Sequence, residues 1–261
     1  MICIGAHPDD CEIEFGGTAA KLAARGDQVK FLSVTNGAAG HHVHPGPKLV
    51  AIRQNEAKEA ARRLGISETA ILQNPDGQLI ASIDARNEII REIRTWEADV
   101  VITHRPWDYH PDHRATGQLV QDSAYLVMVP YICPDTPPLR RNPAFFHLED
   151  SFHSPVPFAA DIAVNIDDVW ERKLDALDAH RSQVYEWLPF VDGEPVPDGA
   201  EARRKWLDRT WTREPSSCTR AALARRYGPE YAARIRHAEA VELSEYGRQP
   251  SPREMDEMFP R

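Results

Sequence analysis

The first ten residues, MICIGAHPDD (1–10), join an apolar run directly to a cluster of histidine and aspartate. Ile2–Gly5 has the composition of a buried strand. Val100–Thr103 is a second run of this kind, and a second histidine–aspartate cluster follows it at residues 110–113. Runs that are apolar throughout are typical of strands covered on both faces of a sheet. The two stretches therefore predict buried strands that end in polar loops.

Between and beyond these strands, short apolar runs alternate with amphipathic stretches. Thr18 is expected to cap the first helix, while Gly26 and Gly65 are stop signals for the first and second helices. Such alternation predicts an α/β fold, Rossmann-like and doubly wound, with a mainly parallel sheet and helices on both faces. The spacing predicts strands over residues 2–5, 29–34, 70–72, 100–103 and 162–166, and helices over 18–25, 49–64, 84–96, 113–129 and about 167–180.

The character of the chain changes after residue 129. Seven prolines lie between Pro130 and Pro157, too many for regular elements, so we expect a long excursion there. From Tyr185 onward the sequence predicts a loop followed by helices rich in arginine and alanine. We expect a catalytic domain over residues 1–183. Residues 184–261 are expected to form a helical C-terminal elaboration that packs on it and does not fold independently.

Composition limits the classes of function. With 42% hydrophobic and 27% charged residues, the 261-residue chain is typical of soluble globular proteins. Its net charge of −9 argues against nucleic acid as a partner, because phosphate contacts need a basic surface. Residues 201–237 are locally basic, with ten Arg and Lys against four Asp and Glu. We interpret them as a helical face that forms salt bridges to the acidic body.

The N-terminus and the four cysteines indicate in which compartment of the cell the protein is expected. The cysteines form no CxxC pair, which disfavours a disulfide framework or a cysteine-rich zinc site. No apolar run approaches the roughly 18–20 residues of a membrane-spanning helix. The first residues already have a strand pattern and lack a basic region before a long apolar segment, so a signal peptide is not expected. We therefore expect a cytoplasmic protein with no membrane partner.

The two histidine–aspartate clusters predict a metal site. Ligands of open α/β sheets bind outside the carboxyl ends of the strands, where both clusters leave the sheet. His7 and Asp10 can point inward from one tight turn, and His113 can supply a third ligand from the start of a helix. Imidazole and carboxylate together suit zinc with one position open for water. Asp9 then remains as a free carboxylate beside the metal.

Two other functions are compatible with these residues. Two histidines and one carboxylate also describe the iron(II) site of non-haem oxygenases. The free carboxylate of Asp9 and the doubly wound sheet favour hydrolysis instead. A binding protein that keeps the fold without turnover is the second alternative. Outside the two clusters, His41, His42 and His44 form either an adventitious metal site or a loop that rims the pocket.

The motifs AHPDDCEIEFGGT, TNGAAG, RQNEAKEAARRLG, NPDGQL and THRPWDYHPDHRATG occur in this order. In these motifs the chain resembles the PIG-L/LmbE-like zinc N-deacetylases, densely over about its first 130 residues. A later HRSQ at residues 180–183 is similar to another element of that family. Two positions depart from the pattern. Cys11 stands where many members have Glu or Ala, and Asp108 stands where one branch has a tyrosine, with Tyr109 one residue later.

The resemblance implies a role for each matching residue. It makes His7, Asp10 and His113 the zinc ligands and Asp9 the general base. His110 would stabilise or protonate the tetrahedral intermediate, with Asp112 orienting its ring. Substrate contacts are expected from Arg53, Asp76, Asn36 and His180.

These patterns together predict a zinc-dependent hydrolase. We expect it to remove an N-acyl group, most simply acetyl, from an amino sugar or a related small amide, with a glycoconjugate as the small-molecule partner. Either Asp9 or His110 would protonate the leaving amine. We also expect a homo-oligomer in which residues 130–160 or 185–215 form a subunit contact and help to wall the pocket.

Overall fold

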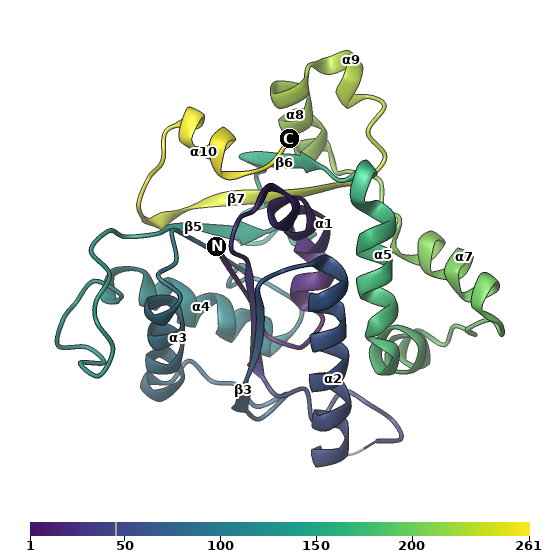
Figure 1. Cartoon of the computed structure of the whole chain (residues 1–261), viewed down its shortest axis with the longest axis horizontal. Coiled ribbons are helices and arrows are strands. Elements are labelled where there is room, and N and C mark those ends of the chain that lie inside the picture. Colours follow the sequence, from purple (N-terminus) through teal and green to yellow (C-terminus); the bar gives the residue numbers. More distant parts are fainter. Residues whose placement is uncertain (45) are drawn as a thin grey trace.

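The computed structural model describes residues 1–44 and 46–261 of the chain. Within these residues seven strands form one sheet in the order β3-β2-β1-β4-β5-β7-β6 (Figure 1). The strands are β1 (Ile2–Gly5), β2 (Lys30–Thr35), β3 (Glu68–Asn74), β4 (Val100–Thr103), β5 (Ala144–Leu148), β6 (Ile162–Asn165) and β7 (Ala238–Gly247). The first five are mutually parallel, and β7 is antiparallel to both of its neighbours. This confirms the predicted α/β fold with a mainly parallel sheet.

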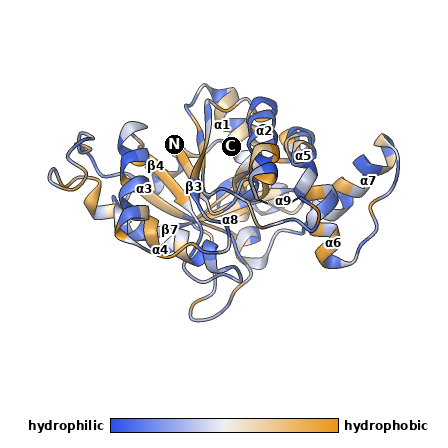
Figure 2. Cartoon of the chain, turned by 90° about the horizontal axis from the view of Figure 1, so that it is seen from below, coloured by the Kyte–Doolittle hydropathy of each residue, from blue (hydrophilic) through white to orange (hydrophobic). Residues whose placement is uncertain are grey.

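Helices cover both faces of the sheet. Figure 2 shows α1, α2 and α5 on one side and α3 and α4 on the other. The helices are α1 (Asp10–Arg25), α2 (Gly46–Leu64), α3 (Ile83–Thr95), α4 (Pro111–Leu126), α5 (Trp170–Ala179), α6 (Leu188–Asp192), α7 (Ala200–Trp211), α8 (Ser217–Tyr227), α9 (Pro229–Ala232) and α10 (Pro252–Met258), with a 3-10 turn at Asp167–Val169 and a π-helical segment at Ser182–Trp187.

Burial on both faces explains why the residues of strand β1 are apolar throughout. Successive side chains of a strand point to opposite faces. Cys3 packs into the core under α1 and α5, whereas Ile2 and Ile4 pack into the core formed with α3 and α4. All three side chains are fully buried. A strand covered on both sides has no face on which a polar residue could be solvated.

The first helix begins earlier than predicted. It starts at Asp10, so Thr18 lies inside the helix and does not cap it. Within the helix, the carboxylate of Glu239 in β7 accepts the backbone N–H of Gly17 at 2.9 Å and that of Thr18 at 2.7 Å. The stop signal at Gly26 is confirmed, with φ +95.

Two strands were not predicted. β5 lies within the proline-rich excursion, and β7 lies in the tail for which only helices were expected. β7 fills the gap between β5 and β6, pairing Leu243 with Phe146 and Glu239 with Val164. The tail therefore completes the central sheet in addition to packing on it. The domain boundary at residue 183 and the subunit contact stay predictions.

Two basic residues of the tail form salt bridges to carboxylates outside residues 201–237, as expected. Arg204 Nη1 lies 2.9 Å from Oδ1 of Asp175, and Arg226 Nε lies 2.8 Å from Oδ1 of Asp256. Across residues 1–44 and 46–261, no helix is both long and apolar enough to cross a bilayer.

The two adjacent glycines of α1 give a matched test of packing. A Cβ on Gly17 would lie 2.8 to 2.9 Å from three side-chain atoms of buried Ile166, whereas a Cβ on Gly16 would meet Lys173 at an ordinary 3.6 Å. Overpacking costs about 1–3 kcal/mol, and alanine gains up to about 1 kcal/mol over glycine in a helix. We expect Gly17→Ala to lower the free energy of unfolding and Gly16→Ala to leave it unchanged or raise it, as measured by urea denaturation. Equal effects of the two substitutions would contradict this packing.

Candidate active site

Two polar loops meet at the carboxyl edge of the sheet, as predicted. β1 and β4 are parallel neighbours with Ile4 paired to Thr103, so the chain leaves both strands side by side. The first loop turns at once into α1, and the second reaches α4, whose N-cap is His110. A Cβ at Gly5 would lie 2.8 Å from Cβ of Asp10, so the first turn requires a glycine at that position.

The three predicted metal ligands converge on one point. Nδ1 of His7 lies 3.2 Å from Nε2 of His113 and 3.6 Å from Oδ2 of Asp10. Nε2 of His113 lies 3.4 Å from Oδ1 of Asp10. Ligand atoms of a tetrahedral zinc ion with bonds of about 2.0–2.1 Å are about 3.3–3.4 Å apart. The two imidazole planes are inclined by 48°, so both lone pairs can point to a common centre. The residues therefore fit a metal ion.

The charges around this point also favour a cation. Burial by itself would lower the pKa of His7, but Asp10 and Asp112 raise it well above its ordinary value. Burial likewise acts to lower the pKa of His113, and Asp10 and Asp108 raise it to about 10. Carboxylates that hold protons on two facing imidazoles will also stabilise a divalent ion in their place.

His104, which the motifs left without a role, lies against the same group. Its Nε2 is 3.1 Å from Oδ2 of Asp10, and its ring stacks on His113 with centroids 4.1 Å apart and planes inclined by 13°. Ring lone pairs lie in the ring plane, so two stacked, nearly parallel imidazoles cannot direct them to one ion. Nε2 of His104 also accepts the backbone N–H of Ala6 at 3.1 Å, so His104 packs beside Asp10 and His113 and is not a third nitrogen ligand. Its place directly after β4 is the signal that could have revealed it.

Carboxylates also lie within ion-pair distance of the outer nitrogens of both candidate ligands. Oδ1 of Asp108 lies 3.2 Å from Nδ1 of His113. Oδ1 of Asp76 lies 3.2 Å and Oδ2 of Asp112 lies 3.4 Å from Nε2 of His7. A carboxylate on the outer nitrogen of a ligand histidine fixes its tautomer and ring orientation. Asp108, at the position of the missing tyrosine, thus has a supporting role that the sequence did not reveal.

The resemblance implies that Asp112 orients the His110 ring. In the structure the Asp112 carboxylate points to other groups. It accepts the backbone N–H of Gly77 at 2.7 Å and of Leu79 at 3.1 Å, and it faces His7. Asp112 lies in the first turn of α4, from which its side chain reaches back to the loop after β3. Its link to His110 is through the backbone, since its N–H donates to Nδ1 of His110 at 3.1 Å.

This backbone hydrogen bond defines the tautomer of His110. Because Nδ1 accepts a hydrogen bond, the proton of the neutral ring is on Nε2. Burial lowers the pKa of His110, and the neighbouring His7 lowers it further, which favours the neutral ring. The ring stands edge-on to His7 with centroids 4.6 Å apart. His110 therefore offers an N–H donor beside the candidate ligands.

Asp9 is a buried carboxylate outside the ligand set. Its φ of +148 lies in a region that favours glycine, a strain worth about 1–3 kcal/mol. Oδ1 of Asp9 accepts from Nη2 of buried Arg53 at 3.1 Å, and Arg53 also donates to the carbonyls of Pro8 and Gly37. Burial raises the pKa of Asp9 to about 6, although the Arg53 guanidinium opposes the shift. A carboxylate of this proton affinity suits a general base, a role that stays a prediction.

The four side chains expected to bind substrate have different environments. His180 is fully buried, with Nε2 3.2 Å from Oε1 of Glu12, so it offers no surface to a ligand in this structure. Oδ1 of half-buried Asn36 accepts the N–H of Ala38. Arg53 and Asp76 are buried and make the protein contacts given above. Substrate contacts of Asn36, Arg53 and Asp76 stay predictions.

The histidines at 41–44 border the segment between β2 and α2. His41, His44 and Glu186 bring three ligand-type atoms within 4.8 Å of one another. However, Nδ1 of His41 accepts the backbone N–H of Val43 and of His44, so the proton of the neutral ring is on Nε2, which lies 2.9 Å from Glu186. We interpret this contact as a hydrogen bond that fastens the loop to the π-helical segment.

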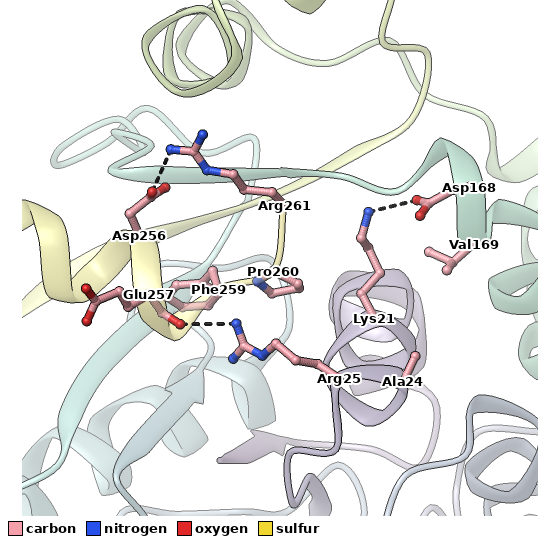
Figure 3. Close-up of a pocket in the computed structure, with 10 residues that line it drawn as sticks. All are labelled: Lys21, Ala24, Arg25, Asp168, Val169, Asp256, Glu257, Phe259, Pro260 and Arg261. Atoms are coloured by element: carbon pink, nitrogen blue, oxygen red, sulfur yellow. Dashed lines mark hydrogen bonds and ion pairs between the residues drawn. The ribbon is translucent and has the colours of Figure 1, made fainter.

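A separate pocket of about 410 Å³ lies between the end of α1 and α10 (Figure 3). Lys21 pairs with Asp168 at 2.8 Å and Arg261 with Asp256 at 2.6 Å. Arg25 donates to two backbone carbonyls of the α10 region. At 1.5 Å per residue, Lys21 is roughly 16 Å along the helix from Asp10. This pocket is therefore not part of the candidate active site.

The fold and the site define an α/β protein with a buried histidine–aspartate cluster, of a kind that fits a metal ion, at the carboxyl edge of its sheet. Residues 2–124 match the model of the PIG-L family, described as GlcNAc-PI de-N-acetylase. The diacetylchitobiose deacetylase of Thermococcus kodakarensis is 31% identical over 201 residues, which cover 73% of this chain and 74% of that one. The chain belongs to the PIG-L family of de-N-acetylases.

Solved structures agree with this assignment. The N,N'-diacetylchitobiose deacetylase of Pyrococcus horikoshii, crystallised with an inhibitor, has a TM-score of 0.68 and 28% identity over 93% of this chain and 82% of that one. The 4-carboxy-2-hydroxymuconate hydratase of Pseudomonas putida has a TM-score of 0.71 at 19% identity, covering 96% of each chain. The second likeness shows the fold alone, so the reaction has to be argued from the site.

Proposed function

We propose that this protein is a zinc-dependent N-deacetylase that acts on an N-acetylated amino sugar, free or within a glycoconjugate. The observation that carries the proposal is the convergence of His7, Asp10 and His113 on one point, with the uncoordinated carboxylate of Asp9 beside it. Two relatives that match across most of the chain are named as diacetylchitobiose deacetylases, which supports an amino-sugar substrate.

When bound, zinc would lower the pKa of a coordinated water and polarise the amide carbonyl. Asp9 is the proton acceptor for the attacking water. Arg53 holds Oδ1, which leaves Oδ2 to take the proton. Burial keeps the proton affinity of this carboxylate high enough to accept a proton and to release it later. The amine leaves with a proton supplied by Asp9 or by His110.

His110 stabilises the developing negative charge on the amide oxygen. Its Nε2–H is fixed as a donor because Nδ1 accepts the N–H of Asp112. We expect His110→Ala to lower kcat by about 10²- to 10³-fold, the usual effect of losing one oxyanion donor. Zinc content should remain at the wild-type level, because His110 is not in the ligand set. Steady-state kinetics and metal analysis on the same preparation test both expectations, and loss of zinc would contradict this role.

The proposed function is tested by acetate release from a panel of N-acetylated sugars. Glucosamine derivatives, chitooligosaccharides and thiol glycosides should be included, with free amine detected independently. Loading the protein with zinc or with iron(II) under anaerobic conditions separates hydrolysis from an oxygenase-type site. Acetate release that requires zinc and no oxygen supports the proposal. A protein that binds these sugars but releases no acetate is a binding protein on this fold.

A further inference from the structure

Both oxygens of the Asp76 carboxylate are engaged, and they join two different parts of the site. Oδ1 lies 3.2 Å from Nε2 of His7. Oδ2 accepts the backbone N–H of Ala39 at 2.8 Å and of Gly40 at 3.2 Å. The carboxylate is buried. One side chain therefore connects a candidate metal ligand to the backbone of residues 36–44, the segment between β2 and α2.

Residues 36–44 are also held by two contacts that do not involve Asp76. Nε2 of Gln183 donates to the carbonyl of Gly40 at 3.1 Å, and His41 pairs with Glu186. Neither contact touches the metal ligands. Asp76 differs from these contacts because its second oxygen faces His7.

We propose that Asp76 is a positioning residue that sets the tautomer of His7 and couples metal binding to the order of residues 36–44. The inference rests on the metal centre proposed above. The contact between Oδ1 and Nε2 of His7 is an ion pair without hydrogen-bond geometry, and the negative charge 3.2 Å away favours the ring proton on Nε2. That leaves the lone pair of His7 on Nδ1, the nitrogen that faces Asp10 and His113.

Asp112 gives a natural comparison. Its Oδ2 lies 3.4 Å from the same Nε2, but its oxygens accept the N–H groups of Gly77 and Leu79 instead of those of Ala39 and Gly40. Two carboxylates thus face the same nitrogen, and of the two only Asp76 carries the link to residues 36–44. Removing either carboxylate should weaken metal binding without abolishing it.

The direct test is Asp76→Asn, which preserves shape and removes charge. If the amide oxygen keeps the N–H groups of Ala39 and Gly40, the NH₂ group faces Nε2 of His7. A donor facing Nε2 opposes the remaining Asp112 carboxylate, shifts the ring proton toward Nδ1 and so competes with the metal for that nitrogen. We expect zinc affinity, measured by chelator competition without substrate, to fall by about 10- to 100-fold.

Two variants separate this role from others. Gln183→Ala loosens the same segment but leaves Asp76 and His7 in place, so zinc affinity should fall much less than in Asp76→Asn. Asp112→Asn should lower zinc affinity while amide exchange at residues 39 and 40 stays unchanged. Wild-type zinc affinity in Asp76→Asn, with only KM raised, would overturn the proposal and make Asp76 a direct substrate contact. An equal loss in Gln183→Ala would also overturn it.

A measurement on the wild-type protein needs no substitution. Zinc binding should slow hydrogen exchange at the amides of Ala39 and Gly40. The amide of His237, which donates to Asp167 outside this segment, is the internal reference and should not change. Uptake of about one zinc per chain tests the metal centre itself. A chain that takes up no zinc refutes the proposed function, whereas stoichiometric uptake with unchanged exchange at residues 39 and 40 refutes the coupling.

Discussion

Alanine at any one of His7, Asp10 and His113 is expected to remove zinc from the protein and to abolish acetate release. Zinc binding by small protein sites is worth about 10–16 kcal/mol, so one ligand among three or four accounts for roughly 3 kcal/mol, or about 10²-fold in affinity. Each substitution also leaves the remaining ligands and their carboxylates without a shared cation. Metal analysis after dialysis against a weak chelator should give about one zinc per wild-type chain and far less in each variant.

The matched control for these substitutions is His153→Ala. His153 is an exposed histidine outside the site, so its loss should change neither zinc content nor turnover. Circular dichroism of all variants separates loss of metal from loss of fold. Zinc stoichiometry that stays near one per chain in all three ligand variants would show that the ligand set is wrong.

Asp9→Asn is expected to differ from the ligand variants, because it should keep its zinc and lose only turnover. Asparagine is nearly isosteric and can still accept a hydrogen bond from Arg53, but it cannot take a proton from water. A positioned general base contributes about 10²- to 10⁴-fold, and kcat should fall by that factor while KM changes little. Single-turnover acetate release together with metal analysis provides the measurement.

An exposed carboxylate supplies the control for this variant. Asp198→Asn removes the same charge far from the candidate ligands in sequence and should leave turnover unchanged. If Asp9→Asn loses its zinc, the roles of the neighbouring Asp9 and Asp10 are exchanged. If it keeps near-normal turnover, another group is the base.

Parts of the fold could be predicted because local sequence and burial agree. β1, β2 and β4 are short apolar runs bounded by polar loops, and both faces of each are covered. β7 was missed because Glu239 is polar in the sequence yet buried in the structure, where its carboxylate lies 2.7 Å from Nζ of Lys173. A charge neutralised by a residue 66 positions away cannot be recognised from local pattern.

The candidate site also has residues that could be predicted from the sequence and contacts that could not. His7, Asp10 and His113 could be predicted because strand ends in a parallel sheet meet at one edge, and each cluster follows a strand. The supporting contacts could not, since they depend on side-chain direction. Asp112 turns toward His7 instead of the His110 ring, and His104 stacks on His113. These contacts depend on the packing of α4 against the strand ends, which spacing does not reveal.

The position of β7 has a consequence for the order of events during synthesis. Residues 144–148 and 162–165 leave the ribosome well before residues 238–247, which separate them in the finished sheet. Until then, the nascent β5 has one edge of unpaired backbone groups, a template for association with other chains. Proline cannot donate to such an edge, and Pro143 directly precedes the strand. We therefore expect Pro143 to limit such association until β7 has been synthesised.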